Sequence, residues 1–145
     1  MRKVILNQPE RVIEFVENGI LGWAEIFYDR QSQAVGVEQD GELVAGIVYH
    51  NYCHNAQSIE MSGYSTNRRW TSKDMFRFLF DYPFFQLDCR VVYGRTSEKN
   101  KRVRRIWDAL GADEYIIPEL RGEGVAEVIT VLQRDQWLQH PLKRN

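Results

Sequence analysis

Apolar and polar positions alternate along the chain with two different periods, and the changes of period mark the expected elements. Residues 3–6 form a short, mostly apolar run that predicts a strand. Pro9 suits the first turn of a helix because its missing N–H would have no partner there, and apolar residues then recur at helical spacing as far as Gly19. Residues 20–28 predict a second short helix.

A period of two begins at Ala34, and it predicts a series of strands. Asp40-Gly41 is the strongest short hairpin signal of the chain, because this dipeptide tolerates the backbone angles of a tight turn. Residues 43–52 continue as a long strand, and residues 58–65 form another after a turn.

Residues 71–85 predict a helix that is unusually rich in apolar side chains. Thr71 and Asp74 have the spacing of a capping box, in which two side chains satisfy the free amides at the start of a helix. Pro83 is expected to end or kink this helix, because proline removes one helical hydrogen bond and its ring clashes with the preceding turn.

The last third of the chain predicts a strand, a helix and two further strands. Residues 90–96 form an apolar strand, and residues 99–110 form an amphipathic helix that Gly111 closes. The final strands are expected at residues 115–120 and 126–133. The predicted order is therefore β-α-α-β-β-β-α-β-α-β-β, an α/β (α+β) pattern without repeats or linkers.

Composition and charge restrict the class of protein. The 145 residues, with 43% hydrophobic and 27% charged positions, predict a single domain over residues 1–145. A net charge of −1 gives no bulk attraction to nucleic acid or to an anionic membrane, so nucleic acid is an unfavoured partner. The longest apolar run, residues 43–49, is too short to span a bilayer, and the start of the chain lacks a secretory pattern, so we expect a cytoplasmic protein.

Residues 100–112 carry the most specific motif. Asn100 begins a helix, and Leu110-Gly111 follows at the spacing of a Leu-Gly-Phe motif, with Ala112 in place of the phenylalanine. Together with the order of elements, this stretch resembles the GNAT superfamily of N-acetyltransferases, and the resemblance covers nearly the whole chain. With Arg68-Arg69-Trp70 and residues 81–84, the chain is most similar to small GNAT proteins of tailed phages and prophages. The resemblance implies a central mixed, mostly antiparallel sheet flanked by helices, in a bacterial or phage-infected host cytosol.

The resemblance also implies acetyl-CoA as the co-substrate, held at the turn between the fourth strand and the next helix. Free backbone amides and the positive end of a helix favour a pyrophosphate there. The family signature is Arg/Gln-x-x-Gly-x-Gly/Ala, and here residues 69–74 have Ser72 and Asp74 at the two small positions. A capping box with solvated surface charges is the alternative interpretation. The residues expected to bind the cofactor are Ser62, Gly63, Tyr64, Arg68, Arg69, Thr71, Ser72, Lys73 and Asn100.

Acetyl transfer needs a deprotonated amine and a proton for the leaving thiolate. Glu60, in an otherwise apolar strand, is the candidate base, although it can equally be an ordinary charge on the polar face of a strand. Many family members supply the proton from a tyrosine at the position of Trp107, which is more consistent with a core residue here. Tyr64, Tyr93, Ser97 or water can take that role, and Asn100 is expected to orient coenzyme or water.

Three further groups of residues carry side chains that could bind a ligand. His50, Cys53 and His54 lack metal-like spacing, and no metal is expected. A basic face on the last helix is solvated, in contact with the adenosine phosphates of the coenzyme, or bound to nucleic acid. Acidic residues in the two regions that flank the acceptor site of the family can attract a cationic amine or merely favour solubility. The basic residues are Lys99, Lys101, Arg102, Arg104 and Arg105, and the acidic ones are Glu25, Asp29, Glu119 and Glu123.

The sequence therefore predicts an acetyl-CoA-dependent N-acetyltransferase that acts on a primary amine of unknown identity, with Glu60, Asn100 and Tyr64 as catalytic residues. The alternative is a GNAT-fold binding protein with weak or no catalysis, which the change at Trp107 and the altered phosphate loop favour. A nucleic-acid-binding module is a third, weaker hypothesis. A homodimer is a further expectation, because the aromatic-rich helix at residues 75–85 can cover a partner as well as a core.

Overall fold

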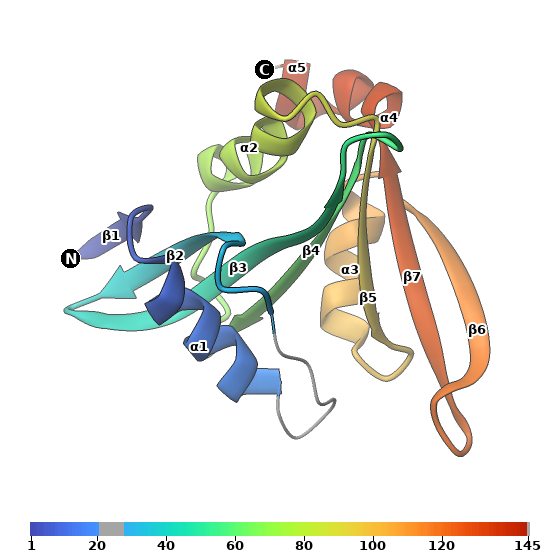
Figure 1. Ribbon diagram of the computed structural model, residues 1–145, viewed down its shortest axis with the longest axis horizontal. Helices are drawn as coiled ribbons and strands as arrows, with labels where there is room; N and C mark the ends of the chain where they lie inside the picture. The colour runs from blue at the N-terminus through green and yellow to red at the C-terminus, as the bar shows by residue number, and fades with distance from the viewer. Residues whose placement is uncertain (21–27, 145) are drawn as a thin grey trace. The chain divides into compact units, whose positions relative to one another are not determined.

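The computed structural model describes residues 1–20 and 28–144 (Figure 1). The elements are β1 (Arg2–Ile5), α1 (Pro9–Ile20), β2 (Gln33–Gln39), β3 (Glu42–Cys53), β4 (Ser58–Ser65), α2 (Lys73–Asp81), the π-helix η1 (Tyr82–Gln86), β5 (Val91–Ser97), α3 (Lys101–Ala109), β6 (Asp113–Gly122), β7 (Val125–Gln133), α4 (Arg134–Gln139) and α5 (Pro141–Arg144). No helix in these described ranges is long and apolar enough to cross a membrane.

Seven strands form one sheet in the order β1-β2-β3-β4-β5-β7-β6. The pair of β4 and β5 is parallel, whereas β1–β2, β2–β3, β5–β7 and β6–β7 are antiparallel. The prediction of a mixed, mostly antiparallel sheet with helices is confirmed. The chain folds into two compact units, which we call the N-terminal unit (Met1–Asn51 and Met61–Ser72) and the C-terminal unit (Tyr52–Glu60 and Lys73–Asn145).

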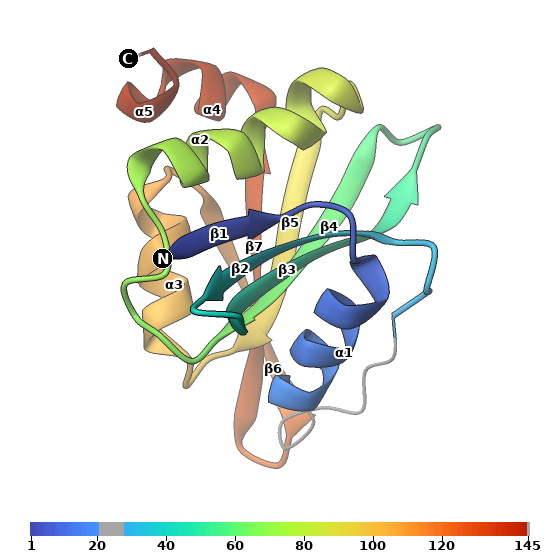
Figure 2. The same cartoon turned by 90° about the vertical axis from the view of Figure 1, so that its left-hand side faces the viewer.

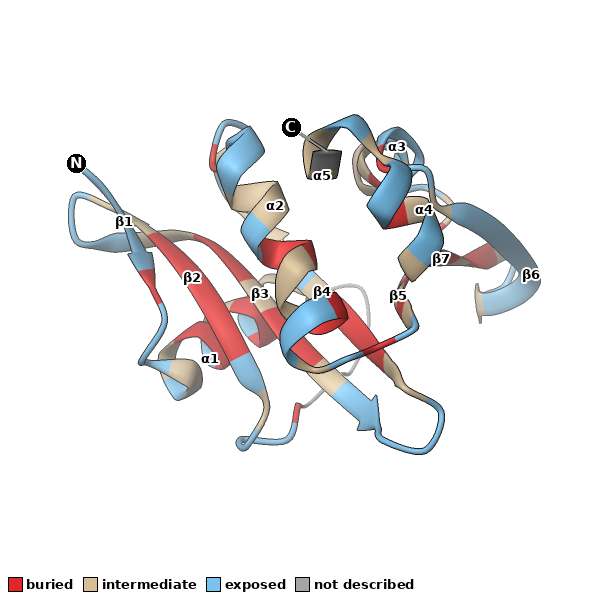
Figure 3. Cartoon of the chain, turned by 90° about the horizontal axis from the view of Figure 1, so that it is seen from above, coloured by how far each residue is buried: buried red, intermediate tan, exposed pale blue. Residues whose placement is uncertain are grey.

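In the N-terminal unit, α1 packs its apolar stripe on β2 and β3 (Figures 2 and 3). Val12 and Val16 are fully buried on this stripe. Two glycines allow the close approach: a Cβ at Gly36 would lie 2.8 Å from Val12 Cγ2, and one at Gly46 would lie 2.9 Å from Val16 Cγ2. The helix thus lies directly on the backbone of the two strands, which larger side chains at these positions would prevent.

The hairpin between β2 and β3 follows the predicted turn. Asp40 and Gly41 have φ angles of 53° and 88°, so both central residues lie in the left-handed region that a two-residue hairpin of type I′ requires. The amino terminus lies beside this turn, where the ammonium group of Met1 is 2.6 Å from Asp40 Oδ1.

In the C-terminal unit, α3 begins at Lys101 rather than at the predicted residue 99, and Gly111 closes it as predicted. Asn100 Oδ1 accepts a hydrogen bond from the backbone N–H of Val103 at 3.3 Å and so caps the first turn. Gly111 follows the helix with φ of 90°, as a C-terminal cap. Trp107 is 8% exposed and packs edge-on against Phe80, with ring centroids 5.5 Å apart, which agrees with its interpretation as a core residue.

Several expectations about helices need correction. The predicted helix at residues 20–28 falls mostly on residues 21–27, outside the described residues, and Tyr28 itself is not helical. The predicted capping box at Thr71 does not begin a helix there, since α2 begins at Lys73, the Thr71 hydroxyl donates to the carbonyl of Ser72, and Asp74 accepts from Arg77. The spacing of a capping box was present, but the two side chains bind other partners.

Pro83 changes the helix in the predicted place. The α-helical stretch ends at Asp81 and continues as the π-helix, in which the N–H of Leu87 bonds to the carbonyl of Tyr82 at 3.2 Å. A proline has no N–H to give to the ladder, and a wider turn accommodates its ring.

Two C-terminal helices, α4 and α5, are present that were not predicted. Gln133 and Gln136 form a reciprocal capping box at the start of α4. Trp137, fully buried, donates its indole N–H to Asp81 Oδ1 at 2.8 Å and packs on Phe80. Packing of one tryptophan on α2 thus stabilises a six-residue helix that would be too short to persist alone.

Candidate functional site

Glu60 is a buried carboxylate in the part of β4 that belongs to the C-terminal unit. Its side chain is 5% exposed, and the parallel register places Glu60 opposite Tyr93 of β5. Burial raises the pKa of the Tyr93 hydroxyl, and the negative charge of Glu60 raises that pKa further. A buried carboxylate is costly without compensating interactions. The negative charge of Glu60 also raises the pKa of Arg95.

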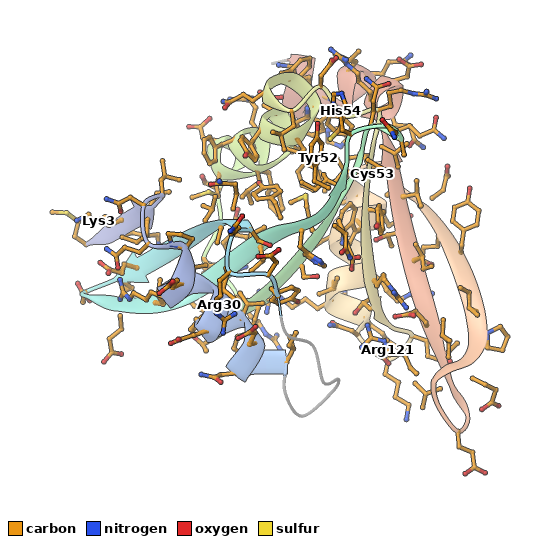
Figure 4. The ribbon with its side chains drawn as sticks, in the orientation of Figure 1. Lys3, Arg30, Tyr52, Cys53, His54 and Arg121 are labelled. Carbon is orange, nitrogen blue, oxygen red and sulfur yellow. The ribbon has the colours of Figure 1, made fainter. Side chains whose placement is uncertain are left out.

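A buried glutamate joins two arginines, Arg95 and Arg121, in the C-terminal unit. Glu127 of β7 is 3% exposed, and its two oxygens accept from Arg95 Nη2 at 2.5 Å and from Arg121 Nε at 3.0 Å (Arg121 is labelled in Figure 4). Burial raises the pKa of Glu127, but the two guanidinium groups outweigh it, and the pKa is lowered overall. Glu127 therefore holds Arg95, whose side chain is 46% exposed, in one orientation.

The N-terminal unit brings together a histidine and a serine. His50 Nε2 of β3 and Ser62 Oγ of β4 lie 2.8 Å apart. The ring of Tyr28 packs on His50, with centroids 4.6 Å apart. Desolvation by burial lowers the pKa of His50 to about 4, so its imidazole is neutral at physiological pH.

Glu17 of α1 fixes the chain beside this histidine. Its carboxylate accepts a bidentate pair of bonds from Arg30, each 2.8 Å long, and a third from the backbone N–H of Tyr28 at 2.8 Å. The hydrogen bond from Arg30 is the main cause of the lowered pKa of Glu17. This clamp holds Tyr28 at α1, where its ring contacts His50.

Gly63 and Tyr64, both expected to bind the cofactor, have clear packing roles. The Tyr64 ring lies against Phe15, with centroids 5.6 Å apart, and a Cβ at Gly19 would come within 2.2 Å of it. A Cβ at Gly63 would lie 2.6 Å from Ile47 Cδ1, so this glycine allows close contact with β3. The catalytic role of Tyr64 stays a prediction, and the structure places its ring against α1.

The segment between β4 and α2 presents two guanidinium groups. Arg68 and Arg69 are exposed, and Asn67 Oδ1 accepts from the N–H of Arg69 at 2.8 Å, which shapes a tight turn. Arg2 of β1 donates to the carbonyl of Arg69. Exposed guanidinium groups on a turn held at both sides can bind a phosphate group.

The predicted site residues fall in both units. Ser62, Gly63, Tyr64, Arg68, Arg69, Thr71 and Ser72 belong to the N-terminal unit, and Glu60, Lys73 and Asn100 belong to the C-terminal unit. Asn100 uses its side-chain oxygen to cap α3. If Asn100 also orients coenzyme or water, as predicted, the same side chain serves both interactions.

The other groups of charged residues have local partners. Arg104, from the predicted basic face, makes a bidentate pair with Glu114 at 2.9 Å for each bond, whereas Lys99, Lys101 and Arg105 are exposed. Among the predicted acceptor-site acids, Asp29 accepts from the N–H of Gln31, Glu119 accepts from the N–H of Gly124, and Glu25 lies outside the described residues. Within the described ranges, no group of three or more His, Cys, Asp or Glu side chains could hold a metal.

Sequence reasoning missed the His50–Ser62 pair and the Arg95–Glu127–Arg121 cluster. A signal was present for each: His50 and Arg95 interrupt apolar strands, where a polar residue needs a partner. The partners, however, come from other strands, and the sequence alone does not identify them.

No protein-family profile matches the chain, and no curated protein matches it by sequence. Solved structures do match. A dodecameric spermidine N-acetyltransferase from Vibrio cholerae superposes with a TM-score of 0.74 at 13% identity, over 97% of this chain and 98% of that one. The chain has the fold of the GNAT acetyltransferases. The structure of yncA from Salmonella typhimurium, which carries the name acetyltransferase and contains its cofactor acetyl-CoA, matches with a TM-score of 0.73 at 12% identity, over 97% of this chain and 96% of that one. RimJ from Mycobacterium smegmatis, in complex with CoA-disulfide, matches with a TM-score of 0.64 at 16% identity, over 78% of this chain and 58% of that one.

Proposed function

We propose that this protein is an acetyl-CoA-dependent N-acetyltransferase that acts on a primary amine. The observation that carries the proposal is the fold, shared over nearly the full length of both chains with a spermidine N-acetyltransferase and with an acetyltransferase that contains acetyl-CoA. Because one fold can host different functions, the proposal depends on the residues of the site.

The pyrophosphate of the coenzyme is proposed to bind where β4 leads into α2. Exposed Arg68 and Arg69 support this, because guanidinium groups bind phosphate oxygens in pairs, and the first amides of α2 add a partial positive charge. The backbone after Glu60 in β4 is proposed to hold the acetyl and pantetheine parts. The full proposed set is Ser62, Gly63, Tyr64, Arg68, Arg69, Thr71, Ser72, Lys73 and Asn100.

Glu60 is the proposed base for the amine, and Asn100 and Tyr64 keep their predicted catalytic roles. The burial of Glu60 supports a functional role for it, since a carboxylate in such surroundings is costly and its protonation is sensitive to its neighbours. The negative charge of Glu60 raises the pKa of the neighbouring Tyr93 hydroxyl and of the Arg95 guanidinium.

The acceptor is proposed to be a primary amine, and a polyamine is the first one to test because structural neighbours are named as spermidine acetyltransferases. The resemblance to phage proteins and the cytosolic location are also retained as predictions. A bacterial or phage-infected host cytosol would supply both acetyl-CoA and polyamines.

A binding protein of the same fold with weak catalysis is the second candidate. The observation that favours it is Trp107, which is packed in the core against Phe80 at the position where many GNAT enzymes have a tyrosine acid. An indole cannot donate a proton to the leaving thiolate in the same way.

Two measurements test the proposal. Isothermal titration with acetyl-CoA and with free CoA should give a micromolar dissociation constant, and millimolar ligand without heat or thermal shift would contradict coenzyme binding. Glu60→Gln should slow acetyl transfer by about 10²-fold. Glu42→Gln, an exposed glutamate at the start of β3, is the matched control and should keep the full rate. Coenzyme binding without turnover would favour the binding protein.

A further inference from the structure

His50 has no role in the chemistry described so far, although its hydrogen-bond partner Ser62 belongs to the proposed coenzyme-binding set. Both residues lie in the N-terminal unit, on strands that are neighbours in the sheet. Their contact, 2.8 Å between Nε2 and Oγ, joins positions 12 residues apart in the sequence. Ser62 lies two residues after Glu60 along β4, in the stretch of backbone that the proposed function assigns to the acetyl group.

The surroundings of His50 fix its ring. Tyr28 packs on it, and Tyr28 is in turn held by the Glu17–Arg30 clamp through its backbone N–H. A ring that packs on one side and contacts a hydroxyl at Nε2 has little freedom to flip. The arrangement therefore holds one nitrogen of His50 at Ser62.

The protonation state of His50 limits what the pair can do. With a pKa of about 4, the imidazole is neutral over the physiological range, and it is too weak a base to take a proton from an amine efficiently. A neutral imidazole has one N–H and one lone pair. When the N–H lies at Nε2, it donates to Ser62 Oγ, and the hydroxyl keeps its own proton for a ligand.

We propose that His50 is a positioning residue for acetyl transfer, which donates Nε2–H to Ser62 and thereby directs the Ser62 hydroxyl proton to the acetyl oxygen. The inference rests on the proposed function. The carbonyl oxygen of a thioester gains negative charge as the amine attacks, and a donor that is already oriented stabilises that charge. Ser62 is then the catalytic residue of the pair, and a neutral histidine acts as a donor, as histidines with a lowered pKa do elsewhere.

Three variants test the proposal. Ser62→Ala removes the donor to the acetyl oxygen, and His50→Phe keeps a ring against Tyr28 but removes the N–H. His50→Gln places an amide N–H near the position of Nε2. We expect the first two to lower kcat by about tenfold to a hundredfold, with KM for acetyl-CoA nearly unchanged, and we expect His50→Gln to retain most of kcat. If His50 had a purely structural role, His50→Gln and His50→Phe would not differ in kcat in this way.

The controls are Ser65→Ala, in the same strand, and His54→Gln, an exposed histidine in the β3–β4 turn, and both should keep the wild-type kcat. The probe amines are spermidine, free lysine and a peptide with a free N-terminus, and the one acetylated fastest is used throughout. Thermal unfolding of each variant checks its fold. If His50→Phe fails to fold, His50→Leu, which also lacks an N–H at this position, replaces it in the comparison with His50→Gln.

The outcomes separate this inference from the proposed function. Failure of the wild-type protein to bind acetyl-CoA in a titration overturns both. If Ser62→Ala transfers the acetyl group at a rate within twofold of the wild-type rate, the role of the pair is overturned and the proposed acetyltransferase activity stands. Binding of acetyl-CoA with transfer to none of the three amines also overturns the inference, because Ser62 then has no reaction to accelerate, and it favours the binding protein.

Discussion

At the scale of single residues, Glu127 is the side chain on which the charge cluster of the C-terminal unit depends. Replacing it by alanine leaves Arg95 and Arg121 without their shared carboxylate, and removal of one partner from a buried ion pair is strongly destabilising. Because Arg95 is partly exposed, we expect a loss of about 2–3 kcal/mol in the free energy of unfolding, measured by urea denaturation. Glu42→Ala, at an exposed position, should change it by less than about 0.5 kcal/mol. Equal effects of the two substitutions would contradict this account of Glu127.

His50 is a second single residue with a large expected effect, because its protonation makes the stability of the protein depend on pH. Its pKa is about 4 in the folded protein and near 6.5 without the fold, so between these values the unfolded chain binds the extra proton. Stability therefore rises with pH through this window and is lost as the pH falls from 6.5 to 4. We expect His50 to account for about 1–2 kcal/mol of that loss, discounted because the ring is partly solvated. His50→Gln should flatten this part of the stability curve, and an unchanged slope would contradict the assignment.

At the scale of elements, the contact between α1 and β4 depends on Gly19. Alanine normally stabilises a helix relative to glycine by up to about 1 kcal/mol. Here its Cβ would lie 2.2 Å from Tyr64 Cδ2, so we expect Gly19→Ala to lower the melting temperature. In a Tyr64→Ala background the clash is absent, and the same substitution should be neutral or stabilising. Additive effects in the double-mutant cycle would show that the two residues do not interact.

Elements also differ in how much of them could be predicted. The hairpin at Asp40-Gly41 and the C-terminal cap of α3 at Gly111 follow from one or two residues each, and both are confirmed, whereas α3 begins at Lys101 and not at the predicted residue 99. Helix α4 was missed because its six residues depend on Trp137 packing against α2. The predicted capping box at Thr71 was wrong because Asp74 pairs with Arg77 instead.

At the scale of the whole molecule, the last strand in the sheet order, β6, exposes a row of apolar side chains. Tyr115 and Ile116 are both 56% exposed, Leu120 is 53% exposed, and β6 pairs only with β7 within the described residues. Its acidic side chains have local partners, as Glu114 binds Arg104 and Glu119 binds the N–H of Gly124. An apolar edge of this length favours pairing with another chain.

The homodimer was expected from the aromatic-rich helix at residues 75–85, and this edge is a second surface at which it can be tested. Light scattering after size-exclusion chromatography should give the mass of a dimer for the wild-type protein, and Ile116→Lys should shift it to a monomer, because a buried lysine opposes strand pairing. Lys101→Glu, on the exposed surface of α3, is the control and should leave the mass unchanged. A wild-type monomer at micromolar concentration would contradict the expectation.

The sequence by itself determined the order of the strands along the chain, helices α1, α2 and α3, the hairpin, the C-terminal cap of α3 and the resemblance to an acetyltransferase fold. These features depend on backbone preferences and apolar periodicity over a few neighbouring residues, so they can be deduced locally. Only the tertiary structure decided which polar side chains meet. His50 and Ser62 are 12 residues apart, Glu17 and Arg30 are 13 apart, and Arg95 and Glu127 are 32 apart. Strand register and the packing of α1 bring these groups together, and a hydrogen bond depends on atomic distances that no spacing in the sequence specifies.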